Sequence, residues 1–377
     1  MLDFYYNLIT FIELISFPLA LLSLIIILFF YFYFFLRFSF LKIKTSSFDQ
    51  PISIIVCAKN ELENLKSNLP LILKQNYHTF EVIVVNDQSI DETSFFLEDL
   101  AKKNKHLVVV DIDSFVTHSP GKKFALTLGI KTAKYEHLLL TDADCVPSSK
   151  SWAGRMISNF NHADIVLGYG SYEKKRGLLN KIIRFDTFNV AQQYLSFALA
   201  RQTYMGVGRN LAYKKSLFFK NKGFASHIHV ASGDDDLFIQ EISRDKKVAI
   251  EVSEHAHTIS DVTQDWKDWI YQKRRHLSTA PYYRYRFKIL LGIYPLAQLL
   301  FLLSLALMFI CKIDVIYLVL LLVIKLVFSY LINYKIMKHL NIFDLYWAHP
   351  LYEFLHLFIQ GNFVLLNLIK KPKKWSR

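Results

Sequence analysis

The stretch His137-Leu-Leu-Leu-Thr-Asp142-Ala-Asp144-Cys-Val-Pro147 is a short apolar run that stops at two carboxylates one residue apart. We expect a buried strand whose C-terminal end carries both acids, because open parallel sheets bind their ligands at that end. Two hard oxygen ligands so close together suit a divalent cation such as Mg²⁺ or Mn²⁺, the usual companion of a diphosphate. A turn or a helix cap explains an Asp-x-Asp equally well, so the neighbouring segments must decide.

Three segments upstream of this stretch also place polar residues at or just after the end of an expected strand. The apolar run 52–58 ends at Lys59 and Asn60, the run 81–86 ends at Asp87, and Lys123 follows the run 107–110 in the first turn of an expected helix. Each polar group alone could be a turn or a cap, and Asn60 is suited to capping. Together they predict one edge of an α/β sheet that binds a nucleotide diphosphate, with acids for base, ribose and metal and lysine for phosphate.

The two ends of the chain are unusually apolar. Residues 14–36 and 289–311 each run for 23 positions without a charge, long enough to cross a bilayer as a helix. A third span is expected at 315–334, interrupted by Lys325. A cleaved signal peptide does not explain the first run, because Asp3 and no basic residue precedes it. We therefore expect an uncleaved anchor in residues 1–45, a catalytic domain in 46–283 and a membrane region in 284–377.

The net charge of +13 could indicate a nucleic acid or an anionic membrane as partner. Basic residues flank the spans at Arg37, Lys42, Arg284 and Arg286, so the membrane is the simpler partner and no nucleic acid is expected. By the positive-inside rule they place the middle of the chain in the cytoplasm. The three cysteines have no paired or metal-ligand spacing, which fits a reducing compartment and predicts no zinc site.

The segment 354–369 has only 16 uncharged residues, which is short for a span, and it is interrupted by His356, Gln360, Asn362 and Asn367. If it crossed, the basic tail 370–377 would end outside the cell, against the positive-inside rule. We expect this segment to lie in the interface or to dip in and return, with the tail at the cytoplasmic headgroups. A fourth, tilted span is the alternative.

Four ordered motifs resemble family 2 of the glycosyltransferases, whose membrane-associated members have a GT-A fold, a Rossmann-like mixed sheet. The motifs are Pro-Ile-Ser-Ile-Ile-Val-Cys-Ala-Lys-Asn-Glu at 51–61, Val-Val-Asn-Asp-Gln-Ser-Ile-Asp-Glu-Thr at 84–93, Gly-Lys-Lys-Phe-Ala-Leu at 121–126 and Thr-Asp-Ala-Asp-Cys-Val-Pro at 141–147. The resemblance implies that Asp87 contacts the nucleobase or ribose, with Lys59 and Asn60 nearby. It also implies that Lys123 lies at the diphosphate, and that Asp144, helped by Asp142, holds the metal.

The segment Gly233-Asp234-Asp235-Asp236 places three acids in a row before an expected helix. The acids repel one another, so at least one should be held by a cap, a metal or a substrate, and an over-capped helix is the plain alternative. By the resemblance, Asp234 is the base that removes the proton of the attacking hydroxyl. Gly233 stands where many members of the family have Glu, so Asp235 is the reserve candidate.

Two further segments resemble parts of the family's acceptor and diphosphate site. Gly208 and Arg209 match a segment that lines the sugar pocket, although glycines often mark only tight turns. Gln272 and Arg275 match the family's Gln-x-x-Arg-Trp motif, with His276 in place of Trp. Aromatic and basic residues near a bilayer are also often only interfacial anchors.

These features together predict a membrane-bound, metal-dependent inverting glycosyltransferase of the bacterial inner membrane. It would move a sugar from a nucleotide-diphosphate sugar, expected to be UDP-linked, to a hydroxyl of a lipid or growing polysaccharide. The alternative is a non-catalytic membrane module that binds a nucleotide sugar or cyclic nucleotide. A transporter is disfavoured because most polar groups lie outside the spans.

Overall fold

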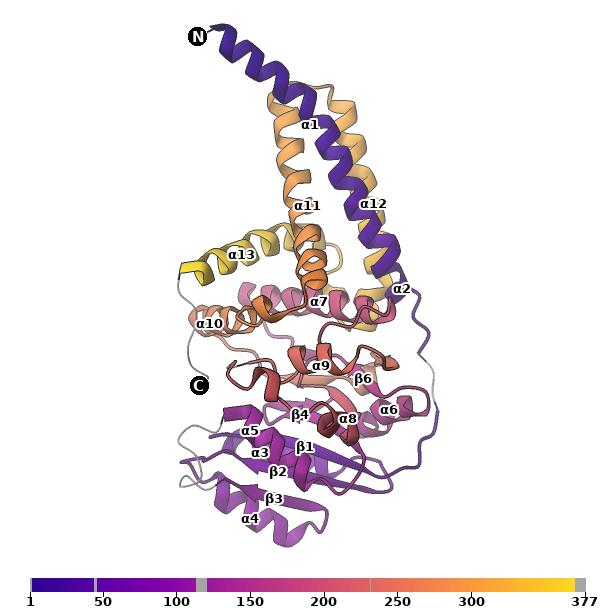
Figure 1. Cartoon of the computed structure of the whole chain (residues 1–377), viewed down its shortest axis with the longest axis vertical. Helices are drawn as coiled ribbons and strands as arrows, with labels where there is room; N and C mark the ends of the chain where they lie inside the picture. The colour runs from indigo at the N-terminus through magenta and orange to yellow at the C-terminus, as the bar shows by residue number, and fades with distance from the viewer. Residues whose placement is uncertain (1, 44–45, 113–120, 231, 370–377) are drawn as a thin grey trace.

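The computed structural model describes residues 2–43, 46–112, 121–230 and 232–369. Figure 1 shows an elongated molecule with a bundle of long helices at one end and an α/β sheet domain at the other. The bundle is formed by α1 (Leu2–Phe30), α11 (Tyr285–Ile310) and α12 (Val315–His339). The basic tail 370–377, for which a place at the headgroups was expected, lies outside the described residues.

The main sheet has seven strands in the order β3-β2-β1-β4-β8-β6-β9. Strands β1, β2, β3 and β4 are parallel, whereas β8 runs antiparallel between β4 and β6. The sheet is therefore mixed, as expected. The strand bounds are β1 Ile52–Ala58, β2 Phe80–Asn86, β3 Leu107–Asp111, β4 His137–Asp142, β6 Ile165–Gly168, β8 Leu211–Lys214 and β9 Val248–Glu251.

Both faces of the central strands are covered, which explains their nearly continuous apolar sequence. Alternate side chains of β1 enter different cores: Ile54 and Val56 pack into one, and Ile55 packs into the other. The first core is covered by α3 (Leu62–Leu73), α4 (Thr93–Lys103) and α6 (Trp152–Ser158). The second lies under α5 (Gly121–Thr132) and α7 (Leu178–Leu199) and continues into the helix bundle.

A second, three-stranded sheet stands directly after the two acids of the opening stretch. Its strands are β5 (Cys145–Pro147), β10 (Thr258–Ser260) and β7 (Gly170–Tyr172), in the order β5-β10-β7. The short helices α8 (Lys215–Lys220) and α9 (Asp236–Ile242) follow β8, and α10 (Trp266–Leu277) follows β10. Segments from both halves of the domain thus surround the end of β4.

Among the described residues, four helices are long and apolar enough to span a membrane. The first covers Leu14–Ser39, where α1 passes through a π-helical turn, Tyr31–Phe35, into α2 (Leu36–Ser39). The second and third are α11 and α12, near the spans expected from the sequence. The fourth is α13 (His349–Ile369), which qualifies by length and composition. The chain is therefore a membrane protein.

Helix α13 is oriented differently from the three others. In Figure 1 it lies across the long axis of the bundle, at the level where the bundle meets the sheet domain, close to α10 and α7. Helix α7 lies between α13 and the main sheet. Most of its side chains are buried, which favours core packing.

Candidate active site

The two acids of the opening stretch lie where the main sheet ends. Asp142 is the last residue of β4, and the turn Ala143-Asp144 leads into β5. The buried amide of Asn68 in α3 fixes this turn by donating to the carbonyl oxygen of Ala143 at 2.9 Å. One ligand atom each of Asp142, Asp144 and Cys145 lies within 4.8 Å of the others.

This cluster fits a hard divalent cation. Burial raises the pKa of the Cys145 thiol, and Mg²⁺ and Mn²⁺ prefer oxygen to sulfur, so the two carboxylates are the better ligands of the cluster. A Mg²⁺ or Mn²⁺ ion held by one or two carboxylates completes its coordination with water and substrate phosphate oxygens. Asp142 and Asp144 would hold the ion, and its chemistry would be to polarise a diphosphate.

Lys122 joins this cluster to the second acidic group. Its Nζ lies 2.8 Å from Asp142 Oδ1 and 3.2 Å from Asp234 Oδ2. Burial alone would lower the pKa of Lys122, but the two carboxylates hold it well above its usual range, so the ammonium stays charged. A fixed cation between these two acids is suited to contact an anionic group that enters the site.

The neighbouring lysine points elsewhere. Lys123 Nζ donates to the carbonyl oxygens of His227 at 2.6 Å and of Val230 at 2.9 Å. It therefore holds the segment that leads towards the three consecutive acids. Consecutive residues of a helix point in different directions, so only one of the two lysines can face the acids. The diphosphate role expected for Lys123 stays a prediction, and Lys122 is the lysine that meets the carboxylates.

Asp87 follows β2 at the same edge of the sheet. Its side chain is 2% exposed, and neither carboxylate oxygen has a hydrogen-bond partner among the described residues. Lys59 Nζ lies 3.8 Å from Oδ2, and burial raises the pKa of Asp87. Asn60 has a left-handed backbone (φ 55°) and accepts from the N–H of Ile90 through Oδ1. A buried carboxylate with free acceptor capacity is costly unless a ligand donates to it.

The three consecutive acids have three different environments. Asp235 accepts from the N–H of Gly208 at 2.9 Å and of Asp236 at 2.8 Å. Asp236 Oδ2 accepts from the hydroxyls of Thr279 at 2.5 Å and Tyr283 at 2.7 Å. Asp234 is the acid that pairs with Lys122 and lines the same small cavity as Asp142 and Gly208.

The charges of these acids follow from their environments. Burial would raise the pKa of Asp234, but Lys122 holds it below its usual range. Burial and then the charges of Asp234 and Asp236 raise the pKa of Asp235 to about 7. Asp234 is therefore ionised at neutral pH and can accept a proton from a hydroxyl.

Arg209 lies beside the metal cluster. Its guanidinium stacks on Tyr172 with 4.5 Å between the guanidinium carbon and the ring centroid, and Nη1 lies 3.4 Å from Ser260 Oγ. The backbone carbonyl of Arg209 accepts from Thr141 at the end of β4. Gly208 approaches Lys122 and Asp235 so closely that a Cβ there would lie 3.4 Å from Lys122 Nζ.

Helix α10 brings Arg275 towards the acids. Burial lowers the pKa of Arg275, and the nearby Asp234 and Asp142 oppose that shift. His276 is solvent-exposed, and its Nε2 lies 3.5 Å from Arg275 Nη2. Gln272 lies one helical turn before Arg275 and His276.

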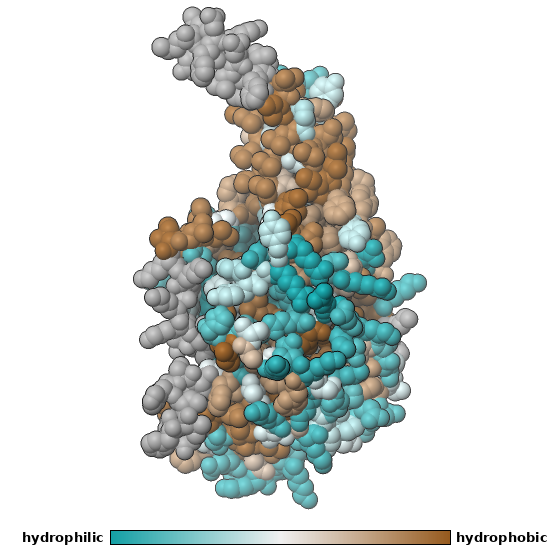
Figure 2. Space-filling view, in the orientation of Figure 1, coloured by the Kyte–Doolittle hydropathy of each residue, from teal (hydrophilic) through white to brown (hydrophobic). Residues whose placement is uncertain are grey.

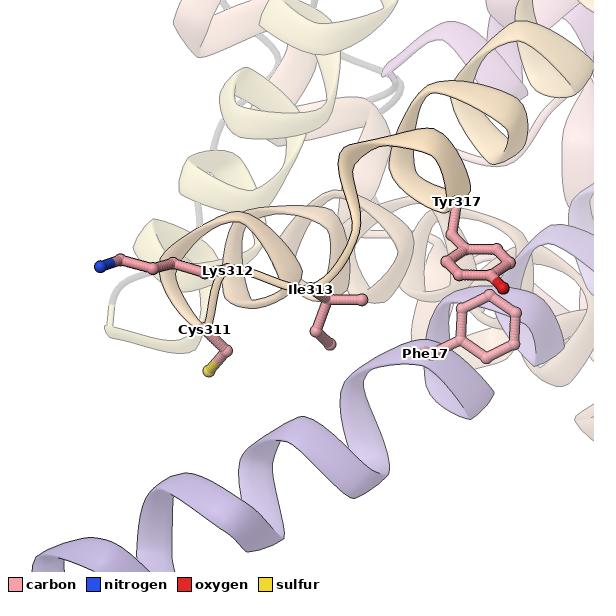
Figure 3. Close-up of a pocket in the computed structure, with 5 residues that line it drawn as sticks. All are labelled: Phe17, Cys311, Lys312, Ile313 and Tyr317. Atoms are coloured by element: carbon pink, nitrogen blue, oxygen red, sulfur yellow. The ribbon is translucent and has the colours of Figure 1, made fainter.

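A larger hollow lies at the far end of the molecule. It has a volume of about 540 Å³ and is lined by Phe17, Tyr317 and residues 311–313, where the turn between α11 and α12 meets α1 (Figure 3). Apart from the Lys312 ammonium and the Cys311 thiol its lining offers little polar chemistry. The chemistry-bearing residues gather instead at the end of β4.

Comparison with known proteins identifies the domain. A family model described as "Glycosyl transferase family 2" matches residues 53–220. This part of the chain is similar to glycosyl transferase family 2. The matched residues contain β1 to β4 and both acids of the metal cluster, which confirms the family resemblance of the sequence motifs.

Two curated proteins are similar to part of this chain. Poly-beta-1,6-N-acetyl-D-glucosamine synthase of Staphylococcus aureus (strain COL) is 26% identical over 213 residues, 55% of this chain and 48% of that protein. An uncharacterized glycosyltransferase of Haemophilus influenzae is 27% identical over 133 residues, 34% of this chain and 40% of that protein. The chain thus spans about half the length, or less, of these curated relatives.

A solved structure supports the GT-A fold. It is the mannosyltransferase PcManGT from Pyrobaculum calidifontis, in complex with GDP-Man and Mn²⁺. The TM-score is 0.55 at 18% identity, and the match covers 91% of this chain and 99% of that chain. At this identity the likeness shows the fold.

Sequence reasoning did not find several residues that shape the site. Thr279 and Tyr283, which bind Asp236, lie more than 40 positions away from it, and no local pattern marks them. The direction of Lys122 depends on the first turn of α5, after residues 113–120.

Proposed function

We propose that this protein is a membrane-bound, metal-dependent inverting glycosyltransferase that uses a nucleotide-diphosphate sugar. The observation that carries the proposal is the placement of Lys122 between Asp142 and Asp234, because it puts a metal-binding carboxylate, a cation and a candidate base in one small cavity. We further propose that the catalytic domain is cytoplasmic and that the membrane is the bacterial inner membrane. The basic residues next to the spans support this orientation.

The donor would lie along the edge formed by β1, β2 and β4. The buried Asp87 carboxylate can accept from the ring N–H of a uracil, and Lys59 beside it can donate to a uracil carbonyl oxygen. The diphosphate would then extend towards Asp142 and Asp144. Lys122 would leave its two carboxylates in part to contact a phosphate oxygen, and Lys123 would keep its place behind the loop.

The transfer step needs charge stabilisation on the leaving side and a base on the other. A divalent ion held by Asp142 and Asp144 would offset the charge that develops on the departing diphosphate. Asp234 would take the proton of the acceptor hydroxyl as the oxygen attacks the anomeric carbon from the face opposite the diphosphate. Asp235 already accepts two backbone N–H groups, which favours Asp234 as the base.

The acceptor is proposed to be a hydroxyl of a lipid or of a growing polysaccharide. Helix α10, which carries Gln272 and Arg275, lies between the helix bundle and the sheet in Figure 1, and Arg275 interacts with the charges of Asp234 and Asp142. The relative named poly-beta-1,6-N-acetyl-D-glucosamine synthase supports a polysaccharide product. Spans that fix the site at a bilayer would keep an apolar acceptor nearby.

The proposal is tested with the purified full chain in detergent, a panel of UDP-, GDP- and dTDP-sugars, and Mn²⁺ or Mg²⁺. We expect nucleoside diphosphate release from a UDP-sugar that needs the metal, rises with a membrane extract as acceptor source, and gives a product with inverted anomeric configuration. Binding of UDP-sugars with no release on any acceptor would instead support a binding module.

A further inference from the structure

A fully buried acid holds three helices together beneath the candidate site. Asp186 of α7 is 0% exposed and forms an ion pair with Lys273 of α10. Its Oδ1 also lies 3.0 Å from His356 Nε2 and accepts from Gln360 Nε2 at 2.7 Å, both from α13. Burial would raise the pKa of Asp186, but Lys273 and His356 hold it below its usual range. Asp186 therefore joins α7, α10 and α13 through a charged centre.

Helix α10 has a second attachment to α13. Arg274 donates to Asn367 Oδ1 and to the carbonyl oxygen of Leu366, both at 3.0 Å, and Asn367 Nδ2 donates back to the Arg274 carbonyl oxygen at 2.9 Å. The rings of Trp269 and Phe363 also meet edge to face at 5.5 Å between centroids. Neighbouring residues of α10 thus divide their roles: Lys273 and Arg274 bind α7 and α13, whereas Arg275 approaches the acids.

The polar contacts of α13 with α7 and α10 are spread along the length of α13. His356 and Asn367 are 11 residues apart, which corresponds to about 16 Å of helix. At the start of α13, Glu353 pairs with Lys325 of α12 at 2.7 Å and so ties the helix to the bundle. His356, Gln360 and Asn367 form a polar stripe along α13. If α13 crossed the bilayer, one end of this stripe would move away from its partners on α7 and α10. The contacts therefore favour a helix that lies along the domain.

The opposite face of α13 is apolar and exposed. Phe354, Phe358, Leu365 and Leu368 are 44%, 47%, 60% and 78% exposed, and Gly361 lies among them. In Figure 2 the apolar surface of the bundle continues onto this helix. Because that surface belongs to spans, the occupant that fits the face of α13 is the acyl and headgroup boundary of the same bilayer.

We propose that Asp186 is a positioning residue that fastens α10 to an α13 seated in the plane of the membrane, so that lipid contact sets the place of Arg275 over the acids. The role of Arg275 in this statement rests on the proposed function. The contacts that Asp186 makes with α10 and α13 do not depend on the proposed function, and their effect can be measured without measuring sugar transfer. The partner is a lipid surface, and the coupling passes through Lys273, Arg274 and Asn367.

The first test measures the depth of α13 in phospholipid vesicles. Single cysteines replace Phe354, Gly361 or Leu368 in a parent with Cys57→Ala and Cys311→Ser, in which only the buried Cys145 remains, and are labelled with a fluorophore and quenched by lipids brominated at different depths. A Cβ at Gly361 meets nothing within 4 Å, so the central position tolerates the change. We expect one shallow depth at all three positions. In a spanning helix the central label lies about 10 Å deeper than the end labels, and that result overturns the proposal.

The second test measures the place of α10. Spin labels on the exposed Lys267 of α10 and Lys131 of α5 report the distance between that helix and the sheet domain. Asp186→Asn leaves the Lys273 ammonium without its ion-pair partner, so we expect a shifted or broader distance distribution. Adding Lys273→Gln removes the unpaired charge and should restore the parent distribution.

The matched control is Asp344→Asn. Asp344 also pairs with α7, through Arg184 at 2.6 and 2.9 Å, but the structure shows it bound to Arg184 and Lys174 and not to α10. Its loss should leave the spin-label distance unchanged. An unchanged distance in Asp186→Asn, or the same shift in Asp344→Asn, contradicts the positioning role. If Asp186→Asn does not fold, the depth measurement still decides whether α13 is seated in the lipid.

Turnover separates this inference from the proposed function. In vesicles, Asp186→Asn should lower kcat about a hundredfold, as expected when a substrate-positioning group moves by about 1 Å, and the double variant should recover most of it. Equal kcat in Asp186→Asn and the parent contradicts the coupling. If the parent transfers no sugar, the proposed function fails, whereas the depth and distance results still decide the fastening.

Discussion

The donor edge and the acceptor edge of the candidate site are held in place by different kinds of interaction. On the donor edge, Asp87 and Asp142 come at the ends of parallel strands, so the sheet fixes them directly. On the acceptor edge, Asp234 and Arg275 stand at helices attached through long-range polar contacts. The comparison implies that the donor edge is sensitive to local changes, whereas the acceptor edge is also sensitive to changes far from the chemistry.

The largest effect is expected on the donor edge, from Asp144→Ala. Removing one of two carboxylates that would hold the ion should lower turnover about a thousandfold or more, since metal stabilisation of the leaving group amounts to several kcal/mol. The measurement is sugar transfer together with Mn²⁺ binding by calorimetry. Asp99→Ala, at an exposed acid of α4 that pairs with Lys103, is the control and should change neither. Full transfer by Asp144→Ala would contradict the metal assignment.

A large effect is also expected on the acceptor edge, from Asp234→Asn. Loss of the base should lower kcat about 10² to 10⁴-fold while UDP affinity stays close to that of the parent. Asp235→Asn is the matched variant, because the Asp235 carboxylate already binds two backbone N–H groups. Single-turnover rates and nucleotide affinity measure both variants. If only Asp235→Asn loses transfer, the base is Asp235.

The same contrast explains how far sequence reasoning reached. The apolar run before Asp142 predicts a buried strand, and a strand end in a parallel sheet has a defined place, so the fold and the donor edge could be predicted. Lys122 and Lys123 differ only in direction around one helix, which the motif does not specify. Tyr283 and Asp186 act on residues 47 and 87 positions away, and such contacts arise from tertiary packing alone. The roles given to the site residues, on the donor edge as well as on the acceptor edge, stay predictions.

The two lysines provide a sharper test of the donor edge. Lys122→Met should weaken Mn²⁺-dependent UDP-sugar binding about tenfold to a hundredfold, the range for a lost hydrogen bond to a charged group. Lys123→Met should leave that affinity almost unchanged but lower the apparent Tm, because two buried carbonyl oxygens lose their donor. Calorimetric titration and thermal unfolding in detergent separate the two effects. The reverse pattern would restore Lys123 as the diphosphate lysine.

The smallest effect we predict concerns stability at the acceptor edge. Asp235 has a pKa raised to about 7 by burial and by the charges of Asp234 and Asp236. Folding therefore favours its protonated form, and the cost of ionising it grows as pH rises from the unfolded pKa near 4 towards the folded value. Asparagine at this position has no charge to bury. Compared with the parent, Asp235→Asn should thus gain about 3 kcal/mol more at pH 8 than at pH 5, since the folded pKa lies about two units above pH 5 and each unit corresponds to about 1.4 kcal/mol.

Apparent Tm at pH 5, 6.5 and 8 in the same detergent measures this difference. In Asp235→Asn, the N–H of Gly208 or of Asp236 loses its hydrogen-bond acceptor, which lowers the Tm of the variant at every pH. Only the change of the Tm difference with pH therefore reports the charge of Asp235. The control is Asp99→Asn, at the exposed acid of α4. The difference between its apparent Tm and that of the parent should not change between pH 5 and 8. If the Tm difference between Asp235→Asn and the parent also stays constant between pH 5 and 8, Asp235 ionises with its ordinary pKa. The acceptor edge would then carry two ionised acids beside Lys122, and Asp235 would compete with Asp234 for the role of base.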